Sequence, residues 1–339
     1  MVFSPKDRWG KISETLIRKV NLIGESPPFL EALEQSISIA PLDIIVLLLG
    51  ETGTGKEQFA RAIHQLSHRA SGAFVPADCA ALPETLFAHE LFGHERGAFT
   101  DAREAKKGLI TMASGGTLFL DEIESLSLGA QGALLRLLEN KTWRPLGSPN
   151  FQPLNCRIIA ASNQDLLQLA QDKTFRIDLY YRLSVSVVTL PPLRERRKDI
   201  DLLVRHFLHL YGRAYHREGL TVSQEALNAL ITYNYPGNIR ELQNILQQAI
   251  IRAAGSCISS QDLPVPTPST QISPQSWTEA RRQAISSWEK AFLSHLLSSS
   301  TGNVSSVASQ LHLSRQVLYR LLKRHQLFPL HRTGAHTAP

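Results

Sequence analysis

The segment Gly50-Glu51-Thr52-Gly53-Thr54-Gly55-Lys56-Glu57 indicates the fold class of this chain. It follows an apolar, β-rich run at Ile44–Leu49 and opens a helical pattern at Gly55–Leu66. In that setting the glycines let backbone N–H groups crowd around a phosphate, and the helix N-terminus favours the anion. Lys56 would reach the β- and γ-phosphates of a nucleotide. All eight residues are therefore candidates for binding ATP.

Glu57 stands where the strict form of this motif has Ser or Thr, so no hydroxyl is available to bind Mg²⁺. The ion must then depend on the phosphates, on water and on an acid elsewhere in the chain. That acid follows the apolar run Thr117–Leu120, which ends in Asp121 and Glu122. We assign Asp121 to Mg²⁺ and Glu122 to the attacking water, because consecutive residues leaving a strand point in different directions. Taken alone, Asp-Glu after a strand is more often a helix cap.

Apolar runs and helical patterns alternate up to Pro191-Pro192, which predicts an α/β fold with a parallel sheet flanked by helices. After that point the apolar spacing is wholly helical, and it predicts a small helical lid. The strands are expected at 44–49, 73–77, 117–120, 157–161 and 185–190, and the helices at 55–66, 128–140, 198–211, 224–233 and 238–252. We divide the chain into a short N-terminal segment (1–21), an α/β subdomain (22–190), the lid (191–258), a linker rich in Ser, Pro, Gln and Thr (259–276), a helix-turn-helix unit (277–329) and a tail (330–339).

Composition narrows the class of protein further. The chain has no charged-then-apolar leader and no apolar run long enough to span a membrane. Its three cysteines are far apart in sequence, which indicates neither a disulfide framework nor a zinc site. We therefore expect a cytoplasmic protein. Residues 277–339 hold eight Lys or Arg and two Glu, so the whole formal excess of +6 lies there, where it can neutralise phosphates of nucleic acid.

Four further polar residues are placed to act on a triphosphate. Asn163 follows the expected strand at 157–161, where a γ-phosphate or a water can be sensed; alone it would be a turn residue. Arg176 and Arg182 lie six residues apart in a helical stretch, and Arg suits the charge of a transferring phosphoryl group as well as it suits an ordinary salt bridge. In the lid, Asn238 is expected to cap a helix whose first turn carries Arg240.

The phosphate loop, the segment Gly115–Glu122, and the segments at 97–102, 175–183 and 235–242 together resemble the sigma-54-dependent enhancer-binding activators, a branch of the AAA+ ATPases. The resemblance covers about Leu22 to Leu327. It implies a hexameric ring with ATP between subunits, Arg176 and Arg182 acting in trans as arginine fingers, and Arg240 as the nucleotide sensor of the lid. Ile23 and Gly24 resemble the residues that line the adenine.

The segment Gly97-Ala98-Phe99-Thr100-Asp101-Ala102 is the most diagnostic part of this resemblance. Its composition is typical of a mobile surface loop with one aromatic tip, although a hairpin turn that buries Phe99 would read the same way. The resemblance implies that this loop contacts sigma-54 and moves with the nucleotide state.

Three residues depart from the pattern of the family. Asp101 stands in place of a second glycine, which restricts the loop and adds charge. Asp78 stands where the family commonly has an asparagine that restrains the catalytic glutamate, and it would repel Glu122. Tyr235 replaces the commoner tryptophan. These changes put the switching and the sigma-54 affinity of the chain in question.

The last unit reads as helix, tight turn, helix, and it resembles a factor-for-inversion-stimulation type of DNA-binding module. Leu318, Leu321 and Leu322 repeat on one face of the second helix. The opposite face leaves six side chains for the major groove and the flanking phosphates of double-stranded DNA at an upstream activator sequence: Arg315, Gln316, Tyr319, Arg320, Lys323 and Arg324. Such modules act as dimers.

About twenty residues precede Leu22, too few for a sensing domain, so the chain resembles the phage-shock type of the family. Control by a regulatory protein in trans is the corresponding expectation, and control of expression is equally open. Two rival functions remain. The first is another kind of AAA+ remodelling ATPase, which would need neither the Phe99 loop nor a DNA module. The second is a DNA-binding AAA+ regulator that hydrolyses ATP but does not engage sigma-54.

Overall fold

The computed structural model describes residues 22–82, 84–98 and 104–264, and in the C-terminal region residues 286, 289, 292, 293, 296, 307, 308, 311 and 315–325. Its contacts divide the chain into two units, Met1–Thr267 and Pro268–Pro339, which are described separately. The division falls inside the segment expected to be a linker.

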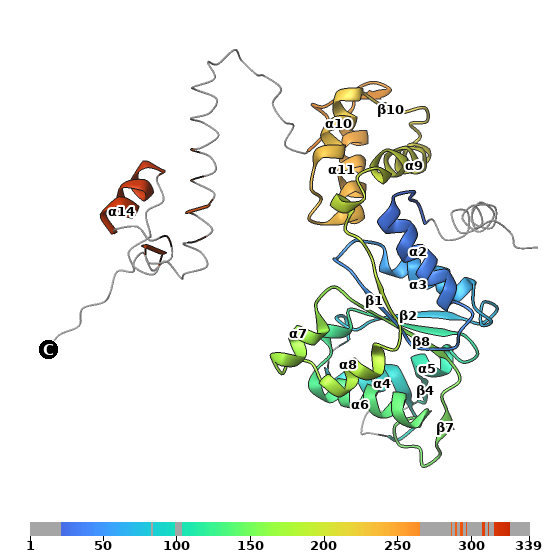
Figure 1. Cartoon of the computed structure of the whole chain (residues 1–339). Coiled ribbons are helices and arrows are strands. Elements are labelled where there is room, and N and C mark those ends of the chain that lie inside the picture. Colours follow the sequence, from blue (N-terminus) through green and yellow to red (C-terminus); the bar gives the residue numbers. More distant parts are fainter. Residues whose placement is uncertain are drawn as a thin grey trace, which may run out of the picture. The chain divides into compact units, whose positions relative to one another are not determined.

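The first unit is built on a five-stranded, wholly parallel sheet with the strand order β2-β5-β8-β1-β9 (Figure 1). The expected α/β fold with a parallel sheet is confirmed. The strands are β1 (Val46–Leu49), β2 (Phe74–Asp78), β5 (Thr117–Asp121), β8 (Arg157–Ser162) and β9 (Val187–Thr189).

Both faces of this sheet are covered, which is why the strands read as nearly continuous apolar runs. In β1, Val46 and Leu48 pack with Phe59 on the side of α2 (Pro27–Ile39) and α3 (Lys56–Gln65). Leu47 points the other way, into a cluster with residues of the helices on the opposite side (Figure 1). Those helices are α4 (Glu84–Phe92), α5 (Leu109–Met112), α6 (Leu128–Asn140), α7 (Leu166–Gln171) and α8 (Ile177–Leu183).

Short elements connect the layers. Two 3₁₀ turns, η1 (Ile123–Ser125) and η2 (Leu193–Glu195), follow β5 and β9. Two-stranded ribbons join β3 (Gly93–His94) to β4 (Lys106–Lys107) and β6 (Thr142–Trp143) to β7 (Gln152–Pro153).

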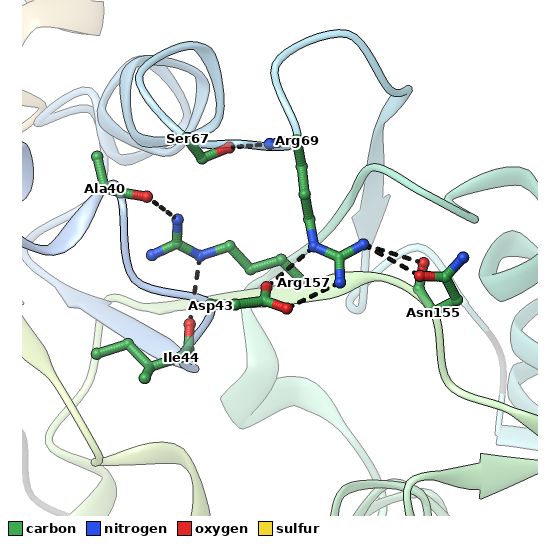
Figure 2. A network of polar contacts seen from close by, with 7 residues as sticks. All are labelled: Ala40, Asp43, Ile44, Ser67, Arg69, Asn155 and Arg157. Carbon is green, nitrogen blue, oxygen red and sulfur yellow. Dashed lines mark hydrogen bonds and ion pairs between the residues drawn. The ribbon is translucent and has the colours of Figure 1, made fainter.

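Two arginines form polar contacts at the end of the sheet where β8 begins, opposite the phosphate loop (Figure 2). Arg157, the first residue of β8, is 2% exposed and donates to the carbonyls of Ala40 at 2.6 Å, Ile39 at 3.0 Å and Ile44 at 3.3 Å. Ile39 and Ala40 lie at the end of α2, where carbonyls lack a partner within the helix, and the Ile39 carbonyl also accepts from the Leu42 N–H at 3.0 Å. Arg69 forms a two-point ion pair with Asp43 nearby.

The lid is a mainly helical subdomain with its own apolar core. Its helices pack Phe207, Leu230 and Leu246 together, and Tyr235 is fully buried with its hydroxyl donating to the Leu230 carbonyl at 2.7 Å. The elements are α9 (Asp199–Ala214), β10 (Thr221–Val222), α10 (Gln224–Thr232), α11 (Asn238–Arg252) and β11 (Cys257–Ile258).

In the second unit, α14 (Arg315–Arg324) is the helix expected to enter DNA. Leu318 and Leu322 are buried in a small core with Leu293, Val307 and Ala308. Gln316, Tyr319 and Arg320 are exposed, as expected from the spacing of the leucines, whereas the side chains of Arg315, Lys323 and Arg324 lie outside the described residues. In the part of the chain that the structure describes, no helix is long and apolar enough to cross a membrane.

Candidate nucleotide site

The phosphate loop runs from the end of β1 at Leu49 to the start of α3 at Lys56. Gly53 and Gly55 have φ of +79° and +100°, in the left-handed region that side chains other than glycine rarely adopt. A Cβ on Gly53 would also lie 2.3 Å from the carbonyl oxygen of Gly237 in the lid. Glycine is therefore required at position 53 both by the backbone and by the close approach of the lid.

Lys56 is 8% exposed, and its ammonium group donates to the carbonyls of Gly50 at 2.8 Å and Glu51 at 3.3 Å. Burial lowers the pKa of Lys56, while the carboxylates of Asp121, Glu124 and Glu122 act in the opposite direction. The lysine is thus a desolvated cation that points into the loop, where a phosphate would supply the negative charge it lacks.

The two carboxylates expected to act on the triphosphate lie at the tip of β5. Asp121 Oδ1 accepts a hydrogen bond from the Glu122 N–H at 3.0 Å. Burial raises the pKa of Asp121, the nearby Lys56 opposes that rise, and Asp78 adds to it. Asp78 lies opposite Asp121 in the register of β2 and β5. Glu122 has a φ of +51°, an unfavourable backbone conformation for a residue with a side chain.

Asp78 itself caps the turn that follows β2, because its Oδ1 accepts from the N–H groups of Ala80 at 3.0 Å and Ala81 at 3.3 Å. Its charge is felt by Asp121, as the raised pKa of that carboxyl shows. In the part of the chain that is described, no group of three or more His, Cys, Asp or Glu side chains forms a cluster able to hold a metal ion. A cation at Asp121 therefore needs ligands from outside the protein.

A cavity of about 390 Å³ lies between the α/β subdomain and the lid. Its size falls within the range of about 300 to 1,000 Å³ usual for small-molecule sites. It brings together ten of the residues that the sequence singled out: Ile23, Thr52, Gly53, Thr54, Gly55, Lys56, Glu57, Asp121, Glu122 and Arg240. The remaining lining residues come mainly from α3, α9 and α11, and the lining also includes Leu22, Phe29 and Arg196.

The sequence did not predict the polar network that closes the end of this cavity where Phe29 and Arg196 lie. Asp199 of the lid is fully buried and accepts from the N–H groups of Glu25 at 2.8 Å and Ser26 at 2.9 Å, and from Ser26 Oγ at 2.7 Å. The guanidinium of Arg196 lies 4.7 Å from the centroid of the Phe29 ring. Burial lowers the pKa of Arg196 to about 10, against the attraction of Asp199.

The only signal for this network in the sequence was the Arg-x-x-Asp spacing at the start of an expected helix, which usually marks an exposed pair. Gly24, expected near the adenine, lies beside this network instead of in the cavity wall. A Cβ there would come within 2.6 Å of the Phe29 ring and 2.8 Å of Asp199 Oδ2.

The expected helix cap in the lid is wrong. Gly237 occupies the cap position of α11, and Asn238 is its first helical residue. The Asn238 side chain turns toward the α/β subdomain, donating to Glu51 Oε2 at 3.1 Å and to the Thr52 carbonyl at 3.0 Å. The cap was predicted from residue type alone, and these contacts between distant segments override it.

Three of the predicted catalytic residues lie away from the cavity of their own chain. The Asn163 N–H donates to Glu124 Oε1 at 3.1 Å. Arg176 precedes α8 and pairs with Asp178 at 2.7 Å, and Arg182 in α8 donates to the Leu138 carbonyl at 2.9 Å. Neither arginine lines the described cavity.

Glu57 lines the cavity, but its carboxylate also pairs with Arg61 one helical turn on, at 2.6 Å. Of the expected sigma-54 contact loop, the structure describes Gly97 and Ala98, while Phe99, Thr100, Asp101 and Ala102 lie outside the described residues. Gly97 has a φ of +83°, and Ala98 lies against Gly147 in the loop between β6 and β7.

Comparison with known proteins gives matches along most of the chain. Residues 22–189 match the sigma-54 interaction domain, and residues 194–280 match the AAA+ ATPase lid domain. The chain is 41% identical to nitrogen fixation protein AnfA of Azotobacter vinelandii over 308 residues, covering 90% of this chain and 57% of AnfA. It is 39% identical to regulatory protein AtoC of Escherichia coli over 316 residues, covering 91% of this chain and 68% of AtoC.

Among solved structures, NtrX from Brucella abortus in complex with ADP matches with a TM-score of 0.68 and 28% identity, covering 94% of this chain and 73% of that chain. NtrX has also been solved in complex with ATP, and that structure matches with a TM-score of 0.67.

A phosphate loop that faces a helical lid across the ends of a parallel sheet is the arrangement of an AAA+ ATPase, and this chain is of that class. Within that class, the match of residues 22–189 to the sigma-54 interaction domain identifies the family. The chain belongs to the family of sigma-54-dependent transcriptional activators. Both the fold and the family expected from the sequence are thereby confirmed.

Proposed function

We propose that this chain hydrolyses ATP and uses the energy to convert the closed complex of sigma-54 RNA polymerase into an open complex. The observation that carries the proposal is that one cavity joins Lys56, Asp121 and Glu122 of the α/β subdomain to Arg240 of the lid. The match to the sigma-54 interaction domain and the nucleotide complexes of NtrX support the same function.

The cavity suits ATP at both ends. The apolar side chains of Ile23, Phe29 and Phe207 line one end and fit a purine base. The other end holds the phosphate loop with the ammonium group of Lys56 and the N-terminus of α3. A triphosphate bound there would meet backbone N–H groups and a desolvated cation.

Asp121 fits the role of a ligand to Mg²⁺, because burial and the neighbouring Asp78 raise the pKa of its carboxyl and an added cation would relieve both effects. Glu57, paired with Arg61, offers no hydroxyl, so the other ligands are phosphate and water oxygens. When bound, the ion neutralises charge on the β- and γ-phosphates.

Hydrolysis then depends on residues from two subunits. Glu122 orients the attacking water and accepts its proton, while Lys56 and Arg240 hold the phosphates. Asn163 senses the γ-phosphate from the tip of β8. Arg176 and Arg182 act on the nucleotide of the neighbouring subunit, in a ring that we propose to be a hexamer. The Arg176–Asp178 pair is exposed, so releasing the arginine costs little.

The loop of residues 97–102 is the proposed contact with sigma-54. The exposed face of α14 is the proposed contact with upstream double-stranded DNA, with Gln316, Tyr319 and Arg320 toward the grooves and phosphates. Two copies of this helix would bind two half-sites about one duplex turn apart. With these partners we infer a cytoplasmic protein, controlled by a regulatory protein in trans.

Open-complex formation with reconstituted sigma-54 polymerase tests the proposal. The intact chain is compared with Phe99→Ala and Glu122→Ala. We expect both variants to fail in promoter melting, with ATP turnover lost only in Glu122→Ala. Melting by Glu122→Ala would refute the catalytic role. Normal melting by Phe99→Ala would instead favour a DNA-binding ATPase that does not engage sigma-54.

A further inference from the structure

One residue fastens the lid to the phosphate loop. Asn238, at the start of α11, is fully buried and uses both ends of its amide. Its Nδ2 group donates to Glu51 Oε2 at 3.1 Å and to the Thr52 carbonyl at 3.0 Å. Its Oδ1 atom accepts from the Leu193 N–H at 2.7 Å. A single side chain thus joins the phosphate loop, the lid helix and the segment that enters the lid.

The backbone beside Asn238 reinforces this contact. The N–H of Ile239 donates to the Gly53 carbonyl at 2.9 Å, and Gly53 has no room for a side chain against Gly237. Asn238 has a φ of +53°, which asparagine tolerates better than most residues. These contacts hold the first turn of α11 against the phosphate loop. Arg240 follows Asn238 by two residues and lines the cavity.

Glu51 is prepared to receive the amide. Its carboxylate forms a two-point ion pair with Arg194, at 2.6 and 2.8 Å, and Arg194 lowers the pKa of that carboxyl. Glu51 therefore stays ionised and accepts from Asn238 at neutral pH. Glu51 itself does not line the cavity, so its side chain faces the lid and not the nucleotide.

The base end of the cavity is held to the lid independently, through Asp199 and the backbone of Glu25 and Ser26. The lid therefore has two separate attachments, one beside the base and one beside the phosphates. Loss of the attachment at Asn238 leaves the contacts at the base end intact.

We propose that Asn238 is a positioning residue that works through Arg240: together with Glu51 it holds the lid arginine at the distance from the phosphate loop that binding of a nucleoside triphosphate needs. This inference rests on the proposed ATP site. It predicts that Asn238 discriminates between nucleotides by their phosphates and leaves recognition of the base unchanged.

The decisive variant is Asn238→Asp. It keeps an oxygen to accept from Leu193 and tolerates a positive φ, but it loses both donors and sets a carboxylate against Glu51. Asn234→Asp is the matched control, since Asn234 lies in the same loop, is exposed and only accepts from Arg197. Binding to the full chain is measured by calorimetry with a non-hydrolysable ATP analogue and with AMP, and thermal unfolding of each variant is recorded.

We expect Asn238→Asp to weaken binding of the ATP analogue by about tenfold, the size of one charge-assisted hydrogen bond. Binding of AMP should change by less than about twofold. The loss should vanish in an Arg240→Ala background, because the two residues act as one unit. Glu51→Gln, which supplies a new donor, should restore part of the binding in the Asn238→Asp chain.

An equal loss for ATP analogue and AMP, or the same loss in the Arg240→Ala background, overturns the positioning role. Behaviour like that of Asn234→Asp overturns it as well. If the unmodified chain binds neither ligand, the proposed ATP site itself is wrong and the inference fails with it. If that chain binds and hydrolyses ATP normally, only the role of Asn238 is in question.

Discussion

Replacing Arg157 by Met tests how much a buried cation contributes at the edge of the sheet opposite the phosphate loop. The methionine side chain fills similar space but donates no hydrogen bonds. The carbonyls of Ala40 and Ile44 would lose their donors at 2.6 and 3.3 Å (Figure 2), whereas the Ile39 carbonyl would keep the Leu42 N–H at 3.0 Å. The end of α2 and the entry to β1 would thus be left with unpaired buried oxygens.

The size of the effect follows from the two carbonyls left without a donor. Each costs about 1 to 3 kcal/mol, or roughly 2 to 6 kcal/mol together. Part of this is returned, since burial of the charge is itself unfavourable, as the lowered pKa of Arg157 shows. We expect a net loss of about 2 to 4 kcal/mol. At about 2 to 4 °C per kcal/mol, the Tm should fall by roughly 4 to 16 °C.

Arg69→Met is the matched control, because Arg69 belongs to the same region but pairs with an Asp43 side chain that is 61% exposed. Such a pair contributes about 0 to 1 kcal/mol, so its loss should lower the Tm by less than about 4 °C. Thermal and urea unfolding followed by circular dichroism measure both variants. Equal shifts in the two, or an unchanged Tm for Arg157→Met, would refute the reasoning.

Three other outcomes are expected. Burial lowers the pKa of His64, whose Nδ1 lies 2.9 Å from Thr117 Oγ1, so the neutral histidine stabilises the fold above its ordinary pKa of 6.5 and this stabilisation is lost as the pH falls below that value. In urea unfolding, the free energy of unfolding should therefore differ less between pH 7.5 and pH 5.5 in His64→Gln than in the unmodified chain. Lys56→Ala and Arg176→Ala chains should each be inactive alone. If Arg176 acts on the site of a neighbouring subunit, an equimolar mixture of the two should regain about a quarter of wild-type ATP turnover, because about a quarter of the sites then combine an intact lysine with an intact arginine. If Arg176 acts within its own subunit, the mixture should regain none. The logarithm of the DNA-binding constant should fall linearly with that of salt, with a slope smaller by about 1 in Arg320→Ala; an unchanged slope would exclude a phosphate contact.

Local patterns were enough to predict most of the first unit. The α6 helix begins and ends where the sequence placed it, since Ser127 accepts from the Ala130 N–H as an N-cap and the apolar spacing runs to Asn140. All five strands of the sheet were predicted to within two residues or so, because strands buried on both faces read as apolar runs. The motif at 50–57 fixed the position of the cavity along the chain.

The unpredicted parts depend on contacts between distant residues. Helix α2 was not predicted, because its opening Pro27-Pro28 resembles a turn as much as a helix start. From sequence alone Asn238 is expected to be a helix cap, because its contact with Glu51, 187 residues away in the chain, cannot be inferred from the local pattern. The buried pairing of Arg196 with Asp199 resembles a surface ion pair in sequence. The proposed action of Arg176 and Arg182 between subunits would involve a second chain, which no pattern within one chain can specify.

The left-handed backbone at Glu122 costs the protein roughly 1 to 3 kcal/mol of stability. Glycine would relax that conformation, yet glycine has no carboxylate to take a proton from water. A substitution chosen here for thermal resistance would therefore remove the group that we propose as the base. Substitutions intended to raise the thermal stability of the protein should therefore keep Glu122 and be made at positions far from the tip of β5.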